Sequence, residues 1–215
     1  LKAVINALGQ VTEILAYDMQ GRVLSVYDSN KVVTDYQYSP RGWPTQVTVR
    51  GETPAQDQTT TLAYGPGGHL KQVRHPDGSM LTYGYDASQR LTDIADGAGN
   101  TKHYVLDAAG NRVSEATVDE AGALRFSVGR AFDTLGQLSA VMDAGGQSTT
   151  FQYDKSGNVV RLSDALGHVT EQGYDALNRR SRERQDVGGV DAQTSVVFDA
   201  LDRVSEVTDP RGLVT

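Results

Sequence analysis

A phrase of about 21 residues returns nine times along this 215-residue chain, and each copy contains an aromatic residue or its equivalent. These nine aromatic positions are Tyr17, Tyr38, Tyr64, Tyr85, Leu106, Phe132, Tyr153, Tyr174 and Phe198. They are separated by steps of 21, 26, 21, 21, 26, 21, 21 and 24 residues. So regular a repeat predicts an array of similar units, in which each unit depends on its neighbours for burial.

A turn is predicted directly after each aromatic position. Most units place Asp at the first position of this turn, where it can accept hydrogen bonds from backbone N–H groups two residues on. The fourth position is glycine in six of the nine units, and glycine takes a positive φ without a Cβ penalty. These nine fourth positions are Gly21, Gly42, Gly68, Gln89, Gly110, Gly136, Gly157, Asn178 and Asp202. The spacing predicts a type I turn with a G1 bulge, which is a common hairpin connection.

A second turn phrase follows about ten residues later in eight of the units. These phrases start at Asp28, His75, Asp96, Asp119, Asp143, Asp164, Asp186 and Asp209. The unit after Tyr38 has the longer stretch 50–58 instead, and the 26-residue step from Leu106 divides as 12 plus 14. We expect both insertions to lie in surface loops, which tolerate extra residues best.

Six or seven residues remain between turns, which suits a β-strand and is under two turns of helix. Strands that enter the aromatic position alternate apolar residues in seven of nine units, as in Leu62/Tyr64 and Tyr83/Tyr85. Outgoing strands space their apolar residues three apart, as in Leu70/Val73. That odd spacing puts the two residues on opposite faces unless a bulge intervenes, and the sequence leaves this open.

The predicted fold class is all-β, with antiparallel β-hairpin repeats forming a wide coiled sheet over residues 1–215 as a single repeat region. Roughly eighteen strands at ~4.8 Å would span about 85 Å, which is too broad for a flat twisted sheet. The two edges of such a sheet predict edge-to-edge self-association.

Charge and composition exclude several classes of protein. The net charge is −7 with scattered basic residues, which does not suit a nucleic-acid binder. The one basic run, residues 179–184, is interpreted as a solvated strand face. No apolar run approaches the ~20 residues of a membrane span, no signal-peptide pattern opens the sequence, and the chain has no cysteine.

We predict no catalytic, cofactor-binding or metal-binding residues, and no enzymatic activity. His69, His75, His103 and His168 share no metal-ligand spacing, and the turn aspartates are interpreted as local caps rather than Ca²⁺ ligands. The aromatic residues could stack on sugars, but packing between strands is preferred. Trp43 stands at a turn position where other units carry Arg, His, Asn or Gln.

The unit, Tyr-Asp-x-x-Gly-Arg-Leu-x-x-Val-x-Asp-x-x-Gly, resembles the Rhs repeat, also called the YD repeat. This family includes bacterial Rhs polymorphic toxins, the C component of insecticidal Tc toxins, and teneurins. The best matches are YDMQGRVLSVYD (17–28), YDASQRLTDIAD (85–96), LDAAGNRVSEATVD (106–119), YDKSGNVVRLSD (153–164) and FDALDRVSEVTDPRG (198–212). Nine units in register cover nearly the whole chain.

The resemblance implies a β-sheet strip that winds into a hollow shell around a toxic C-terminal domain. We therefore expect a segment of a shell wall from a bacterial toxin used in competition and delivered by a secretion system. Its expected partners are the remainder of the shell and the enclosed toxin. The phrase Asp209–Leu213 looks like the DPxGL motif that ends the core of bacterial Rhs proteins, but we interpret it as another second turn. The alternative function is a repeat module that binds carbohydrate or a cell surface.

Overall fold

The fold is all-β, as the repeat predicts. A computed structural model describes residues 2–187 and 189–215 of the chain. Its nineteen strands belong to an antiparallel sheet, and η1 is a single 3-10 turn. The strands divide between two compact units, residues 1–103 with 118–123 and residues 104–117 with 124–215, which are described separately.

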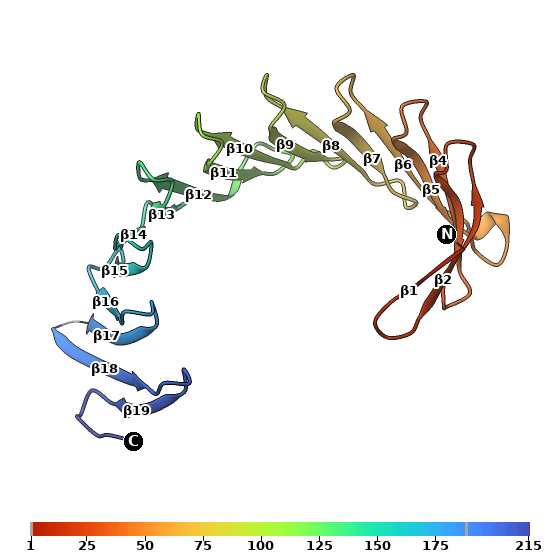
Figure 1. The fold of residues 1–215 in the computed structure, drawn as a ribbon. Helices are drawn as coiled ribbons and strands as arrows, with labels where there is room; N and C mark the ends of the chain where they lie inside the picture. Colours follow the sequence, from red (N-terminus) through yellow and green to blue (C-terminus); the bar gives the residue numbers. More distant parts are fainter. Residues whose placement is uncertain (1, 188) are drawn as a thin grey trace. The chain divides into compact units, whose positions relative to one another are not determined.

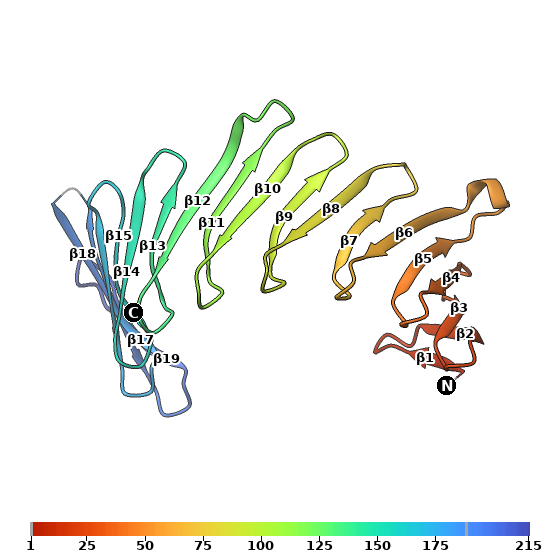
Figure 2. The same cartoon turned by 90° about the horizontal axis from the view of Figure 1, so that it is seen from above.

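Each strand pairs antiparallel with the next one along the chain, from β1 to β10 and from β12 to β19 (Figures 1 and 2). The first unit holds β1 (Ala3–Ile5), β2 (Val11–Tyr17), β3 (Val23–Tyr27), β4 (Val33–Tyr38), β5 (Pro44–Val49), η1 (Pro54–Gln56), β6 (Gln58–Tyr64), β7 (Leu70–Arg74), β8 (Met80–Tyr85) and β9 (Leu91–Asp96). Both units contribute residues to β10 (Thr101–Leu106) and β11 (Arg112–Val118). The second unit holds β12 (Leu124–Phe132), β13 (Leu138–Asp143), β14 (Ser148–Tyr153), β15 (Val159–Ser163), β16 (Val169–Tyr174), β17 (Arg180–Val187), β18 (Val190–Phe198) and β19 (Val204–Thr208).

Every aromatic position is the last residue of a strand, so the repeat correctly predicts where the entering strands end. The fourth residue of each first turn has a positive φ, including the non-glycine residues Gln89, Asn178 and Asp202. The second turns also end in a positive φ, at Lys31 and at glycines such as Gly167 and Gly212. The turn at Asp209 is one of these, which confirms its interpretation as a second turn.

In the outgoing strands, a β-bulge decides whether apolar residues three positions apart lie on the same face of the sheet. Tyr64 of β6 lies opposite Leu70, and Leu62 lies opposite Val73, because the pairing skips Lys71. One inserted residue restores the alternation, so the two apolar residues three positions apart share a face. The same shift occurs in the pairs β8–β9, β12–β13, β14–β15 and β18–β19.

In the first unit, the sheet has one face rich in apolar side chains and one polar face. Residues directly opposite each other on paired strands lie on the same face. In the first unit, Leu62, Val73 and Leu81 form a line across β6–β8 on the apolar face. On the opposite face of the first unit, Thr48 lies opposite Thr59, and their hydroxyl oxygens are 3.1 Å apart.

Neither unit builds a conventional core. Among the described residues, only Val73, Tyr104, Thr48 and Glu115 are buried. A single layer of sheet leaves both faces accessible, so most side chains are only half-buried between neighbouring strands. Lateral contacts between hairpins therefore carry much of the stabilisation.

The two insertions differ from each other. Residues 50–57 form a loop with a 3-10 turn, as expected, and Gln58 begins β6. The extra residues of the step from Leu106 instead lengthen β11 and β12, and the turn between them stays tight, so the loop prediction was wrong there. Added strand residues can continue an existing hydrogen-bond ladder, which avoids leaving backbone groups unpaired in a loop.

Candidate functional site

The turns are closed by the aspartate side chain. In the first turn of its unit, Asp154 accepts hydrogen bonds at Oδ1 from the backbone N–H of Ser156 (2.8 Å) and Asn158 (2.9 Å). Asp164 does the same in the second turn, accepting from Leu166 (2.9 Å) and His168 (2.8 Å). The same pair of hydrogen bonds therefore closes the turns at both ends of a hairpin. The carboxylate accepts from turn N–H groups that have no carbonyl partner on a neighbouring strand.

Hydrogen bonds to these carboxylates lower their pKa. The side-chain amide of Asn158, followed by its backbone N–H, lowers the pKa of Asp154. The side chain of Arg179, whose Nε lies 2.7 Å from Oδ2, has the same effect on Asp175. Both aspartates are held in the ionised form by groups within four residues, which is a structural role.

Tyrosine hydroxyls connect consecutive hairpins. The hydroxyl of each of four tyrosines donates to a backbone carbonyl fifteen residues earlier, on the first residue of the preceding outgoing strand. The donor and acceptor pairs are Tyr38 to Val23 (2.8 Å), Tyr85 to Leu70 (2.9 Å), Tyr153 to Leu138 (2.8 Å) and Tyr174 to Val159 (3.1 Å). The aromatic position therefore joins its own hairpin to the one before it.

In four units, the residue that follows the first turn packs on the next aromatic ring. Four such contacts are Arg22 over Tyr38 (4.9 Å), Trp43 with Tyr64 (5.4 Å), His69 with Tyr85 (5.1 Å) and Arg179 over Phe198 (4.5 Å), measured to ring centroids. Arg, Trp and His can all lie against an aromatic ring, which explains why such different residues occupy one position. Sequence reasoning missed this contact, although the unusual placement of Trp43 was the signal for it.

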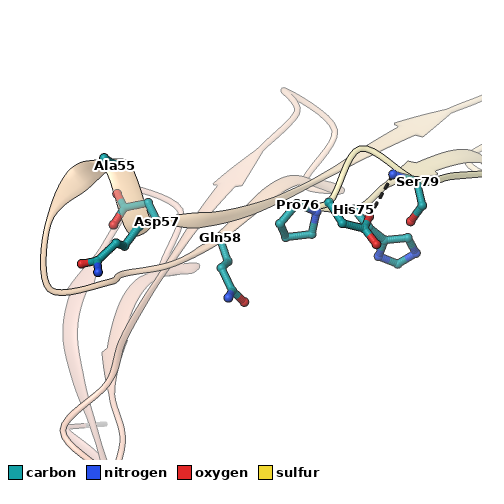
Figure 3. Close-up of a pocket in the computed structure, with 8 residues that line it drawn as sticks. Ala55, Asp57, Gln58, His75, Pro76 and Ser79 are labelled. Atoms are coloured by element: carbon teal, nitrogen blue, oxygen red, sulfur yellow. Dashed lines mark hydrogen bonds between the residues drawn. The ribbon is translucent and has the colours of Figure 1, made fainter.

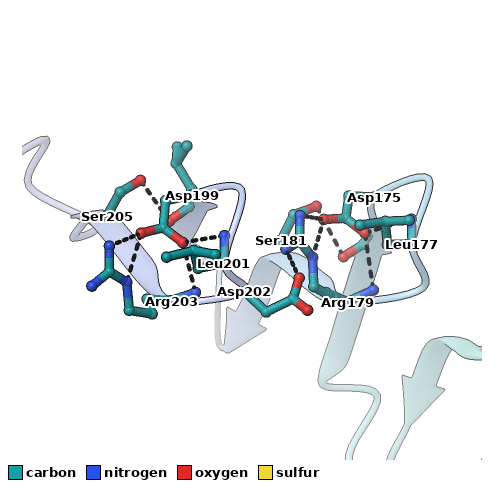
Figure 4. Close-up of polar contacts among 11 residues, drawn as sticks. Asp175, Leu177, Arg179, Ser181, Asp199, Leu201, Asp202, Arg203 and Ser205 are labelled. Carbon is teal, nitrogen blue, oxygen red and sulfur yellow. Dashed lines mark hydrogen bonds and ion pairs between the residues drawn. The ribbon is translucent and has the colours of Figure 1, made fainter.

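Hairpin tips are also linked side by side (Figure 4). In the second unit, Arg179 pairs with Asp175 of its own turn and with Asp202 of the next turn (2.5 Å). One turn earlier, the side-chain amide of Asn158 donates to Asn178 (3.0 Å). In the first unit, Arg22 donates to the carbonyl of Ser39 (3.1 Å). The tips thus form laterally connected rows within each unit.

The basic run is largely neutralised by acidic partners on β16–β18. Arg180 pairs with Glu183 (2.7 Å), while Arg184 pairs with Glu171 (3.1 Å) and Asp191 (2.8 Å). The hydrogen bonds that Arg184 donates to Asp191, and then to Glu171, raise its pKa further above its usual range. The run is a strand face crossed by ion pairs, as interpreted from the sequence.

An open depression of about 710 Å³ lies between η1 and the turn at 75–79 (Figure 3). Of the two aspartates that line it, Asp57 accepts hydrogen bonds from the backbone N–H of Gly51 and from the Arg50 guanidinium, both at 3.0 Å. This side chain therefore holds the inserted loop in place. Within the part of the chain that the structure describes, no three His, Asp or Glu side chains are grouped to hold a metal ion.

The four histidines have different local partners. His69 packs on Tyr85, and His75 closes a turn through its backbone N–H to Ser79. Nδ1 of His103 lies 2.6 Å from Asp93, and Nδ1 of His168 lies 2.8 Å from Asp164. Across the described ranges, no helix is long and apolar enough to cross a membrane.

These contacts define a repeat protein built from antiparallel β-hairpins. Aspartate side chains close its turns, and aromatic residues connect neighbouring hairpins. The RHS Repeat family matches residues 17–53, 66–101, 132–169 and 153–191, which is more than half of the chain. The chain therefore belongs to the RHS repeat family, and it is a repeat segment of that family.

A curated relative is the probable deoxyribonuclease RhsB of Dickeya dadantii (strain 3937), which is 28% identical over 165 residues. That match covers 73% of this chain and 11% of the relative. The crystal structure of TcdB2-TccC3-Cdc42 has a TM-score of 0.62 at 14% identity, covering 93% of this chain and 13% of that chain. A Photorhabdus luminescens Tc holotoxin pore structure has a TM-score of 0.53 at 15% identity, with the same two coverages. These structures show the shared fold, and the chain spans about a tenth of the curated relative.

Removing one tyrosine hydroxyl tests the connection between hairpins. Tyr85→Phe deletes the bond to the Leu70 carbonyl and should lower the free energy of unfolding by about 1 kcal/mol. Tyr64→Phe is the matched control, because its hydroxyl has no hydrogen bond among the described residues. Urea unfolding followed by circular dichroism measures both variants. Equal losses would show that the hydroxyl bond contributes nothing.

Proposed function

We propose that this chain is a non-enzymatic part of a β-sheet shell that encloses a toxin or other C-terminal cargo in an Rhs-type protein. The proposal is supported by the structural role of the side chains that characterise the repeat. Aspartates close most of the turns, and four tyrosines and four of the residues after a first turn join neighbouring hairpins. These side chains therefore stabilise a continuous sheet that can serve as part of a shell wall. The expected partners of this segment are the rest of the shell and the cargo.

Similarity in fold to the TcdB2-TccC3-Cdc42 and Tc holotoxin pore structures supports the proposed shell. The name of the curated relative says that it is a probable deoxyribonuclease. We place any such activity outside this repeat segment, in the enclosed cargo. Delivery by a bacterial secretion system and use in competition form part of the same proposal.

Protection of the cargo tests the proposal directly. In a longer Rhs protein that contains this segment, the cargo should resist limited proteolysis as long as the repeats are folded. Gly68→Arg, which disrupts one turn and its packing, should expose the cargo, whereas Gly136→Asn should leave it protected. A cargo cleaved at the same rate in all three proteins would contradict the enclosing role.

A glycan array separates this proposal from the binding-module alternative. The Tyr85 ring is half-buried and packs on His69 of the preceding hairpin, which supports packing rather than sugar stacking. We expect no saturable glycan binding by the isolated chain. Specific binding that is lost in Tyr85→Ala without unfolding would favour the carbohydrate-binding module instead.

A further inference from the structure

Three charged residues of the second unit break the apolar pattern of the repeat. Arg112 and Glu115 on β11, and Arg130 on β12, stand six and nine residues after one aromatic position and two residues before the next. The equivalent residues on β13 and β14 are Leu138, Val141 and Phe151. The strands of the repeat therefore form without these charges, which makes the three residues candidates for a role other than folding.

Glu115 holds the two arginines together. It is one of the few buried residues in the described part of the chain, at 9% exposure. Its Oε2 lies 3.4 Å from Nη1 of Arg112 and 3.8 Å from Nη2 of Arg130. The Arg112 guanidinium lies over the Tyr104 ring, 3.8 Å from its centroid, and Arg130 lies opposite Val141. The charges are thus set among apolar side chains.

The cluster has more hydrogen-bond donors than acceptors. A guanidinium can only donate, and Nη1 of Arg130 has almost no accessible surface and no hydrogen-bond partner among the described residues. The two guanidiniums also carry one charge more than the Glu115 carboxylate balances. The Arg112 and Arg130 side chains are 45% and 29% exposed, so a further acceptor can approach them from solvent.

We propose that Arg112 and Arg130 bind a carboxylate carried by a polypeptide that lies on this face of the sheet. Such a carboxylate forms charge-assisted hydrogen bonds with guanidiniums and balances the second positive charge. Tyr104 and Val141 place apolar surface beside the charges, which suits an acidic residue flanked by apolar residues better than a free anion. The inference rests on the proposed function, because it names the enclosed cargo as this polypeptide.

NMR of the arginine Nε–H groups in the full 215-residue chain tests the site. The peptide acetyl-Leu-Glu-Leu-amide should shift the Arg112 and Arg130 signals saturably, and leave Arg182 of β17, an exposed arginine, unshifted. The Gln-containing peptide and sodium acetate should each bind about tenfold more weakly or less. Acetate binding as tightly as the Glu peptide would assign the site to a free carboxylate and overturn the polypeptide ligand.

Variants separate binding from folding. Arg112→Leu/Glu115→Val/Arg130→Phe installs the residue types of β13 and β14. It should unfold in urea at no lower concentration than the parent, since apolar residues can replace a buried ion cluster without loss of stability, but it should lose the binding. Arg130→Gln should weaken binding about tenfold, which tests the site even if the triple variant does not fold, and Arg182→Leu should bind normally.

Three results would overturn the inference: no shift at Arg112 and Arg130, equal affinity for the Glu and Gln peptides, or unchanged binding in the folded triple variant and in Arg130→Gln. These measurements use the chain without a cargo. A chain that binds the peptide but fails to protect a cargo would therefore keep this site and lose the shell proposal, and the reverse result would do the opposite.

Discussion

Replacing Gly68 with alanine is expected to destabilise the first unit by about 2–5 kcal/mol. Gly68 has φ +89°, where an alanine costs about 1–2 kcal/mol in strain. A Cβ built there would also lie 2.8 Å from Cζ2 of Trp43, and such overpacking adds about 1–3 kcal/mol. The substitution therefore acts on the turn and on the packing between hairpins together.

Gly136→Ala separates these two effects. Gly136 has φ +78° in the equivalent turn, and a Cβ there would meet no atom within 4 Å, so we expect a loss of only about 1–2 kcal/mol. Urea unfolding measures the stability of both variants. Trp43 is the only tryptophan, so its fluorescence should change in Gly68→Ala and remain native in Gly136→Ala. Equal losses in the two variants would show that the Trp43 contact contributes nothing.

Acid is expected to unfold the repeat over a narrow pH range. Eight turn aspartates have a pKa lowered chiefly by hydrogen bonds from the residue two or four positions later: Asp77, Asp86, Asp96, Asp107, Asp154, Asp175, Asp199 and Asp209. An unfolded Asp has a pKa of about 3.9, so near that pH the unfolded chain binds more protons than the folded chain. Stability is therefore fully present above about pH 5 and falls as the pH drops through the lowered folded values.

The urea midpoint, followed by circular dichroism, should be constant from pH 7 to about 5 and fall steeply below about 4. Several protons should be taken up on unfolding, because many turns respond together. Asp154→Asn should make the fall shallower. Asn6 shows that a neutral amide can close a turn, since its Oδ1 accepts from the backbone N–H of Leu8 and Gln10, both at 3.0 Å. A midpoint at pH 3 equal to that at pH 7 would rule out this role of the turn carboxylates.

The sequence by itself determined the turns and the ends of the strands that enter each aromatic position. Asp154 and Gly157 interact within one five-residue segment, so their types and spacing decide the local backbone without any distant partner. The same reasoning identified Lys31, Asn178 and Asp202 as turn residues although none of them is glycine. The shell and its cargo came from resemblance to a family and remain a proposal.

Only the tertiary structure decided how the hairpins are joined. The bond from Tyr85 to Leu70 and the packing of Trp43 on Tyr64 connect residues at least fifteen positions apart, which no local pattern specifies. The bulge that brings Leu70 and Val73 to one face became visible only in the register with β6. Turn chemistry is local and readable from short spacings, whereas packing between hairpins depends on which strands become neighbours.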